Sequence, residues 1–337
     1  MRSSVSAIIL AAGKGTRMKS DYAKVLHEVF YRPMIHHVLD AVQALALAKN
    51  IVVTGYKRQE VEKVLQGYDV VSAPQEEQLG TGHAVLAAEQ FVARSKTATV
   101  LILCGDTPLI RPETLGRMLD EHCSGGAVLT VMTTLVADPT NYGRIVTDDQ
   151  GRLLAIVEEK DATPEIRAIK EINAGIYCVS SDFLFNALLK VDRNNKQSEV
   201  YLTDIVAIAV NSDYQVSRFS CEDSLEVLGV NSRIELAEAH ACLQNRRNRS
   251  LMLSGVTLLR PETIAIEHSV EIGRDTVIHP HVYIGGSSRI GSNCVIESFT
   301  QIKDSVIGSG ATIGSHSSIN NREIDEGLQI GPHTVYI

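Results

Sequence analysis

The chain has 337 residues, 44% apolar and 21% charged, a composition typical of a globular protein of about two domains. Its net charge of −8 argues against binding nucleic acid or acidic lipid through a broad basic surface. The six cysteines form no CxxC pair, and no apolar run approaches the ~20 residues of a membrane span. We therefore expect a cytoplasmic protein that binds neither nucleic acid nor a membrane.

The first ~219 residues alternate short β-rich runs with amphipathic helices. Strands are predicted at 6–12, 50–54, 69–73 and 99–104, and helices at 33–48, 59–66 and 81–93. Strands that are apolar on both faces and alternate with helices indicate a parallel sheet covered by helices. Ligands bind such sheets at the carboxyl ends of the strands, which makes the loops after Ala12 and Cys104 the first candidates for a site.

The C-terminal part predicts one helix over 231–253, followed by a six-residue repeat. Isoleucines recur every six residues from Ile272 to Ile302 and from Ile307 to Ile319, separated by one five-residue step, and Ile330 follows an irregular insert. Glycine often follows these isoleucines, and we attribute it to the corner dihedrals that glycine permits. The period predicts a hexapeptide parallel β-helix, because a β-sandwich would show period-two alternation. Such helices present flat sides to copies of themselves, so we expect a homotrimer.

The loop after the first strand reads Leu10-Ala11-Ala12-Gly13-Lys14-Gly15-Thr16-Arg17-Met18. It is neither a Walker A motif nor a dinucleotide fingerprint, since Met18 replaces the third glycine. Two glycines let backbone N–H groups turn toward an anion, and nearby cations add positive charge. Local rules equally allow a plain turn. The position after a buried strand favours polyphosphate binding.

At these residues the sequence resembles sugar-1-phosphate nucleotidylyltransferases, and among them the bacterial N-acetylglucosamine-1-phosphate uridylyltransferases. The resemblance runs along the whole chain and includes the motifs Gln-Leu-Gly-Thr-Gly-His-Ala at 78–84, Cys-Gly-Asp at 104–106 and Val-Asn-Ser-Arg at 230–233. It implies an α/β fold: a Rossmann-like nucleotidylyltransferase domain with a mostly parallel sheet at 1–230, a linker helix at 231–253 and a partial left-handed parallel β-helix of hexapeptide repeats at 254–337.

The resemblance implies transfer of uridylyl from UTP to N-acetylglucosamine 1-phosphate, which gives the cell-wall precursor UDP-N-acetylglucosamine and pyrophosphate. The sugar phosphate is already an anion at neutral pH and needs no general base, so catalysis rests on positioning and charge neutralisation. The implied catalytic residues are Arg17, which clamps the triphosphate, and Lys24, which bridges the α-phosphate and the attacking phosphate. Leu10, Ala11, Ala12, Gly13 and Gly15 of the first loop are implied to contact the substrate.

The resemblance makes Asp106 a magnesium ligand and Asn231 its partner. One carboxylate, one amide oxygen and phosphate oxygens form a shell that Mg²⁺ accepts. Local rules offer alternatives: Asp106 could cap the Thr107-Pro108 turn, and Asn231 could cap the helix that begins there.

Substrate contacts carried over from the family fall into two groups. Gln75 would read the uracil edge, with Gly80 and Thr81 beside it, although Gly80-Thr81 is equally a helix start with Thr81 as its cap. The residues implied on the sugar side are Gly143, Glu158, Asn173, Thr203 and, nearby, Tyr201. Each of these alone is a surface polar residue or a turn by default.

The sequence departs from the family at three places. Ala23 replaces a common proline before Lys24, and Cys104 stands where well-known members carry tyrosine. The chain ends at Ile337, and in the bifunctional members further coils carry an acetyltransferase site, so we expect no acetyl transfer. The histidines of the repeat region are expected to be exposed corner residues: His268, His279, His281, His316 and His333.

Two other functions remain open at this point. A glucose-1-phosphate nucleotidylyltransferase also joins this catalytic fold to a β-helix, and turnover with unacetylated sugar phosphate would identify it. A non-catalytic β-helix scaffold would have a decayed nucleotide site, whereas Arg17, Lys24 and Asp106 are all intact.

Overall fold

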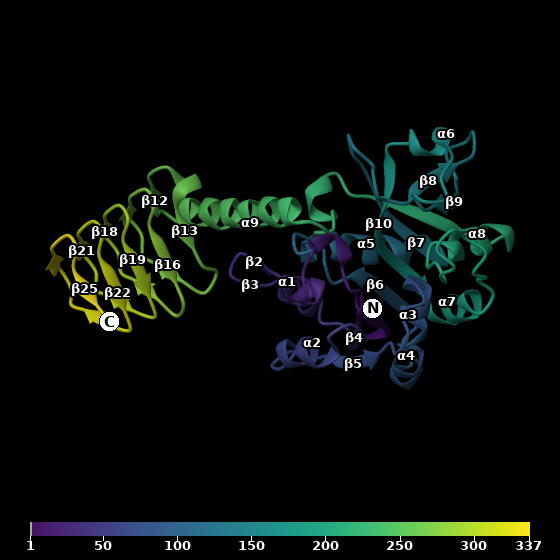
Figure 1. Ribbon diagram of the computed structural model, residues 1–337, viewed down its shortest axis with the longest axis horizontal. Helices are drawn as coiled ribbons and strands as arrows, with labels where there is room; N and C mark the ends of the chain where they lie inside the picture. Colours follow the sequence, from purple (N-terminus) through teal and green to yellow (C-terminus); the bar gives the residue numbers. More distant parts are fainter. Residues whose placement is uncertain (1) are drawn as a thin grey trace. The chain divides into compact units, whose positions relative to one another are not determined.

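The computed structural model describes residues 2–337 and contains two compact units (Figure 1). One unit comprises the residues up to Glu28 and Arg32–Leu236, and the other comprises Val29–Tyr31 and Ala237–Ile337. The boundary expected between residues 230 and 231 falls shortly before this division. Across the described chain, every helix is too short or too polar to span a membrane.

The first unit is built on a nine-stranded sheet with the order β11-β7-β10-β6-β1-β4-β5, and β8 and β9 pair beside β10. Its strands are β1 (Val5–Ala11), β4 (Lys49–Thr54), β5 (Val71–Pro74), β6 (Thr99–Cys104), β7 (Leu129–Leu135), β8 (Arg144–Thr147), β9 (Leu153–Val157), β10 (Glu171–Ser180) and β11 (Val216–Ser220). Strands β5, β4, β1 and β6 run parallel, whereas β10 is antiparallel to both β6 and β7. The predicted mostly parallel sheet is confirmed.

Helices cover this sheet because its strands are apolar on both faces. They are α1 (Met34–Gln43), α2 (Arg58–Val64), α3 (Thr81–Leu86), α4 (Glu89–Ser95), α5 (Pro112–Gly125), α6 (Pro164–Arg167), α7 (Ser181–Leu188) and α8 (Asp204–Asn211). Ile8, Val53 and Ile102 are fully buried, and residues of α3, α4, α7 and α8 pack in the same hydrophobic cluster. The carboxyl ends of β1 and β6 are thereby held side by side.

Two predicted helices differ from those in the structure. The single helix at 81–93 is broken into α3 and α4, because the N–H of Ala88 bonds to the carbonyl of Val85, three residues back, and Ala88 is wholly buried. The helix predicted to reach residue 48 ends at Gln43, and Ala46 takes a left-handed φ of 51°. In both places hydrogen bonds to the carbonyl three residues back replace the helical pattern, and apolar periodicity does not report this change.

The second unit contains the left-handed parallel β-helix, whose coils follow one another from β12 to β25 in Figure 1. Three sheets form its sides, with the orders β12-β15-β18-β21-β24, β13-β16-β19-β22-β25 and β14-β17-β20-β23. The strands are β12 (Thr257–Leu258), β13 (Ala265–Ile266), β14 (Glu271–Ile272), β15 (Val277–Ile278), β16 (Tyr283–Gly285), β17 (Arg289–Ile290), β18 (Val295–Ile296), β19 (Gln301–Lys303), β20 (Val306–Ile307), β21 (Thr312–Ile313), β22 (Ser318–Asn320), β23 (Glu323–Ile324), β24 (Gln329–Ile330) and β25 (Val335–Tyr336).

The isoleucine ladder is the core of this unit. Ile278, Ile296 and Ile313 pair in register on successive coils and are fully buried. The sequence predicted an irregular insert before Ile330, and that prediction is wrong. Ile324 continues the ladder in β23 after a second five-residue step.

The glycines that follow the isoleucines have a different role from the one expected. The left-handed corner positions belong mainly to other residues, such as Asp275 (φ 60°) and Asn293 (φ 59°). A Cβ on Gly273 would lie 2.5 Å from the backbone nitrogen of Ser292 in the next coil, and one on Gly291 would lie 2.6 Å from that of Ser309. Glycine is therefore required by the close approach of successive coils.

Three of the five repeat-region histidines occupy exposed corners. His281, His316 and His333 have left-handed φ values of 60–61° and stack with Phe299 in one column of rings. His268 is exposed without a corner dihedral, and His279 is half-buried.

Candidate active site

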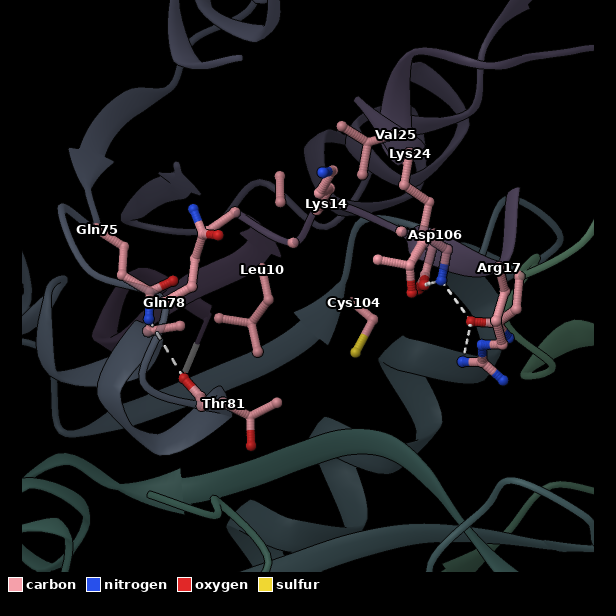
Figure 2. Close-up of a pocket in the computed structure, with 18 of the residues that line it drawn as sticks. Leu10, Lys14, Arg17, Lys24, Val25, Gln75, Gln78, Thr81, Cys104 and Asp106 are labelled. Carbon is pink, nitrogen blue, oxygen red and sulfur yellow. Dashed lines mark hydrogen bonds and ion pairs between the residues drawn. The ribbon is translucent and has the colours of Figure 1, made fainter. Parts of the chain in front are cut away.

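A pocket of about 430 Å³ lies in the first unit where β1 and β6 end (Figure 2). It is lined by Leu10, Ala11, Ala12, Gly13, Lys14, Gly15, Thr16, Arg17, Lys24, Val25, Gln75, Gln78, Gly80, Thr81, Ala84, Cys104, Asp106, Glu199 and Asn231. Every predicted catalytic, metal and uracil-side residue belongs to this set, as do the five residues expected from the first loop. The five sugar-side residues do not.

Charged and amide groups gather at one end of the pocket. The ammonium of Lys24 donates to Asp106 and, at 2.5 Å, to Oδ1 of Asn231. Arg17 Nη2 donates to the same Oδ1 at 2.7 Å (Figure 2). Asp106 follows β6, whereas Arg17 and Lys24 lie on short 3₁₀ turns after β1. Two cations therefore face a carboxylate and an amide oxygen at the strand ends.

Asn231 is free of the capping role that the sequence left open. Helix α9 (Arg233–Leu253) begins two residues later, and Ser232 Oγ accepts the N–H of Glu235 at 3.3 Å. Ser232 is therefore the residue that caps the helix, and the Glu235 carboxylate accepts the backbone N–H of Asn231, the residue before the cap, at 2.7 Å. The Asn231 amide nitrogen donates to the carbonyl of Gly229 at 2.8 Å, which leaves Oδ1 facing the cations.

Asp106 and Asn231 fit a hard divalent cation. Both direct an oxygen at one ammonium group, and a carboxylate with an amide oxygen is a donor set that Mg²⁺ accepts. Within residues 2–337, no three His, Cys, Asp or Glu side chains group closely enough to hold a metal by themselves. A metal here would take its remaining ligands from water and phosphate.

The opposite end of the pocket carries groups suited to a nucleobase. Gln75 is buried, and its amide donates to the Gly80 carbonyl at 3.3 Å and contacts His83 Nδ1 at 3.0 Å. Figure 2 shows Gln75, Gln78 and Thr81 gathered on the far side of Leu10 from Lys24 and Asp106. Thr81 begins α3 but does not cap it, because its hydroxyl accepts the N–H of Leu202 at 3.0 Å.

The five predicted sugar-side residues form a neighbouring cluster of their own. Thr203 Oγ1 donates to Glu158 Oε1 at 3.2 Å, and the N–H of Asn173 donates to the Gly143 carbonyl at 2.9 Å. The Tyr201 hydroxyl donates to Asp161 at 3.2 Å. Burial raises the pKa of Glu158, and its bond from Thr203 opposes that rise.

This cluster is tied to the pocket and has a buried support. The Leu202–Thr81 bond and a Cys104 Sγ–Gly175 carbonyl contact of 3.8 Å connect it to the pocket lining. Arg144, only 2% exposed, bonds to Glu159 at 2.7 Å and to the Tyr142 carbonyl, which joins β8 to the end of β9.

Sequence reasoning missed several residues of the pocket. Gln78 and Ala84 lay inside a quoted motif without an assigned role, while Val25 and Glu199 carried no local signal. Tyr142, which does not line the pocket, was also given no role. Burial raises the pKa of its phenol to about 12, and its neighbours include Glu235, Asp106 and Arg17.

Comparisons with known proteins match both parts of the chain to families. The nucleotidyl transferase family covers residues 6–232, and the bacterial transferase hexapeptide family covers residues 287–321. The bifunctional protein GlmU of Desulfotalea psychrophila is 52% identical over 87% of this chain and 86% of its own length. The GlmU proteins of Geobacter metallireducens and Geotalea daltonii are 47% and 48% identical over 89% of this chain.

The fold is that of a nucleotidyltransferase. The chain belongs to the nucleotidyl transferase family and, within it, to the group of the bifunctional GlmU proteins. It spans 63% and 65% of the lengths of the Geobacter and Geotalea relatives. The resemblance stated from the sequence is confirmed, and a non-catalytic scaffold is disfavoured. Nucleotidyltransferases of this group depend in general on a divalent metal.

Proposed function

We propose that the chain transfers uridylyl from UTP to N-acetylglucosamine 1-phosphate and releases pyrophosphate. The observation that carries this proposal is the convergence of Arg17, Lys24, Asp106 and Asn231 at one end of a pocket whose other end holds Gln75. The sugar-side cluster beside the pocket supplies the place for the second substrate. GlmU relatedness supports the same substrates.

In the proposed reaction, an oxygen of the sugar phosphate attacks the α-phosphorus of UTP. The new P–O bond forms as the bond from the α-phosphorus to the oxygen that bridges to the β-phosphate breaks. That oxygen leaves with the electron pair as part of pyrophosphate. No proton must be removed from the attacking phosphate, so the site needs charge neutralisation and alignment rather than a general base.

The two cations have separate roles in this proposal. Arg17 lies on the first loop and is placed to neutralise charge on the departing pyrophosphate. Lys24 lies between Asp106 and Asn231, where it would contact the α-phosphate and the incoming phosphate and reduce their repulsion. In the free protein both cations donate to Asn231 Oδ1, so both lie beside the oxygens that are proposed to bind the metal.

Asp106 and Asn231 would hold Mg²⁺ through Oδ atoms. When bound, the metal supplies positive charge that neutralises phosphate oxygens. Lys24 occupies the position between these two oxygens in the free protein, so it would shift toward the phosphates as the metal binds. Glu235 holds the backbone of Asn231, which keeps the amide oxygen directed into the pocket during that exchange.

Base and sugar recognition would use the remaining predicted residues. The Gln75 amide offers a donor and an acceptor to a uracil edge, with the backbone of Gly80 and the Thr81 side chain beside it. Glu158 would accept from sugar hydroxyls, with Thr203 and Tyr201 beside it. Gly143 and Asn173 would contact hydroxyl or acetamide groups.

Isotope labelling tests this reaction. With UTP labelled at the α-phosphorus, the label should appear in UDP-N-acetylglucosamine. With label at the γ-phosphorus, it should appear only in pyrophosphate. Release of labelled inorganic phosphate or UDP would instead indicate hydrolysis, and label retained covalently on the protein would indicate an enzyme nucleophile.

The assembly proposed for the chain is a homotrimer formed through the flat sides of the β-helix, in the cytoplasm, where six free cysteines are stable. Sedimentation over a concentration series should show a trimer that dissociates on dilution. A monomer at every concentration would contradict the assembly and leave the proposed reaction standing, because all proposed catalytic residues belong to the first unit.

A further inference from the structure

Strand β10 is interrupted at the sugar-side cluster. Its pairing with β7 shifts register between Asn173 and Tyr177, and Gly175 takes a left-handed φ of 72° within that irregular stretch. Bulges of this kind re-aim side chains next to binding sites. Here the irregularity brings the backbone N–H of Gly175 and the hydroxyl of Tyr177 to the same side chain, the amide of Asn173.

The orientation of the Asn173 amide is fixed by chemistry. The N–H of Gly175 donates at 2.9 Å, and a backbone N–H can only donate, so the atom facing it must be Oδ1. Nδ2 then faces Tyr177 and donates to its phenol oxygen at 2.6 Å. The amide keeps one N–H and one oxygen lone pair for a ligand.

Tyr177 is a buried side chain to which the proposed mechanism gives no task. It is 2% exposed, pairs with Ile102 of β6 and packs in the main hydrophobic cluster. Burial raises the pKa of its phenol far above the usual value, and the nearby Glu158 and Cys104 add to that rise. The phenol therefore stays neutral, and the amide of Asn173 is the partner that a buried hydroxyl requires.

We infer that Tyr177 is a positioning residue for N-acetylglucosamine 1-phosphate, acting by holding the Asn173 amide in one orientation toward the sugar. This inference rests on the proposed function and names a residue that sets affinity for its second substrate. Tyr177 does not touch the sugar in this account. It supplies the second of the two bonds that hold the Asn173 amide, and the N–H of Gly175 supplies the first.

The consequence of losing the hydroxyl follows from the two amide bonds. Without the phenol oxygen, the amide is held only by the N–H of Gly175, so Nδ2 loses its partner and the amide samples a wider range about its terminal torsion, which has no strong preference of its own. An amide held by one bond presents its free N–H to the sugar in a less fixed direction, so productive binding falls. UTP does not contact this part of the site in the proposed arrangement and should bind as before.

Steady-state kinetics of Tyr177→Phe test the inference. The KM for N-acetylglucosamine 1-phosphate should rise about tenfold, the change produced by losing ~1.4 kcal/mol. The KM for UTP should stay within about twofold. Tyr68→Phe is the matched control, because its hydroxyl is also hydrogen-bonded, to Asp40 and Arg32, and lies outside the pocket.

A double-mutant cycle separates positioning from general packing. Tyr177→Phe added to Asn173→Ala should raise the sugar-phosphate KM no further, because the amide it positions is gone. An equal, independent effect in both backgrounds would overturn the inference. So would a rise in both Michaelis constants accompanied by a lower Tm.

A substrate-free readout keeps this inference distinct from the proposed function. In the free protein, NMR of the Asn173 side-chain amide should show faster hydrogen exchange and a shifted ¹⁵N resonance in Tyr177→Phe, but not in Tyr68→Phe. An unchanged Asn173 resonance contradicts the positioning claim. Absence of turnover by the wild-type chain with UTP and the sugar phosphate would contradict the proposed function, whatever the resonance shows.

Discussion

Arg17 and Asn231 are 214 residues apart in the sequence, and Arg17 Nη2 lies 2.7 Å from Asn231 Oδ1. The same oxygen accepts from Lys24, which also pairs with Asp106. Residues from the first loop, the end of β6 and the start of α9 thus meet in one group of charges. That group is the basis of the predictions about catalysis.

Asp106→Asn should leave the fold intact and lower turnover by at least ~100-fold, the scale of losing a central electrostatic element. The amide keeps the shape but removes the charge that a divalent cation needs. Turnover at saturating Mg²⁺ is the measurement, with Asp148→Asn, an aspartate bonded to Arg152 on the surface, as the control. Wild-type turnover in Asp106→Asn would remove this carboxylate from the metal site.

Arg17→Ala should lower kcat more than it raises the KM for the sugar phosphate, because its charge matters most as pyrophosphate departs. Arg152→Ala, which removes an exposed arginine, should change neither constant. If only the sugar-phosphate KM rises in Arg17→Ala, the assignment of Arg17 to the triphosphate is wrong.

Gly80→Ala should weaken UTP binding and destabilise the fold. Gly80 has a φ of 111°, and an added Cβ would lie 2.6 Å from the carbonyl oxygen of Val200. The strain alone costs roughly 1–3 kcal/mol. Gly67→Ala is a matched control, because Gly67 has a φ of 93° but open space around it. Equal losses of Tm in the two variants would show that the contact with Val200 is unimportant.

Asp204→Asn should stabilise the protein above pH 6. Burial, with Asp192 and Asp161 nearby, raises the pKa of Asp204 to about 6. Because the pKa of Asp204 is higher in the folded than in the unfolded protein, its protonated form favours folding. The stability that this proton supplies is fully present below the unfolded pKa near 4 and is lost as pH rises through 6. After allowance for solvent screening, we expect Asp204→Asn to raise the free energy of unfolding by about 1 kcal/mol at pH 8 and to leave it unchanged at pH 3.5. Denaturant unfolding at both pH values measures this, and a gain that persists at pH 3.5 would argue against charge as the cause.

Ile296→Ala should destabilise the β-helix by about 2–5 kcal/mol, because it opens a cavity between the coils of Ile278 and Ile313. Val306→Ala, at an exposed position, should cost far less. Nucleotidyl transfer should stay within about twofold in both variants, since no pocket residue lies beyond Asn231. Loss of transfer in step with the unfolding of Ile296→Ala would show that the reaction depends on the β-helix.

Sequence patterns predicted the parts of the fold that repeat. Continuous apolar strands indicated the parallel sheet, and the isoleucine period indicated the β-helix, because each pattern reflects which side chains are buried. The break at Ala88 was missed because apolar periodicity does not report where helix hydrogen bonds shorten to three residues. The second five-residue step was missed although the sequence contains it, since Ile324 follows Ile319 by five residues as Ile307 follows Ile302.

The candidate site was likewise predictable only in part. Motifs placed Asp106 and Arg17 at strand ends, where the structure brings them into one pocket. The residues that hold other predicted site residues in place lay outside any motif. Glu235 holds the backbone of Asn231, and Tyr177 holds the side chain of Asn173. Such supports are read only from three-dimensional contacts, because neither residue type nor spacing distinguishes them from ordinary helix or core positions.

The most direct test of the account is pyrophosphate release by the purified chain over a panel of nucleoside triphosphates and sugar phosphates with Mg²⁺. We predict the highest kcat/KM for UTP with N-acetylglucosamine 1-phosphate, and a large loss when either the base or the acetamido group is changed. Preference for glucose 1-phosphate would assign the chain to the other class of nucleotidylyltransferases that carry a β-helix. No release with any UTP pair would contradict the account at its centre.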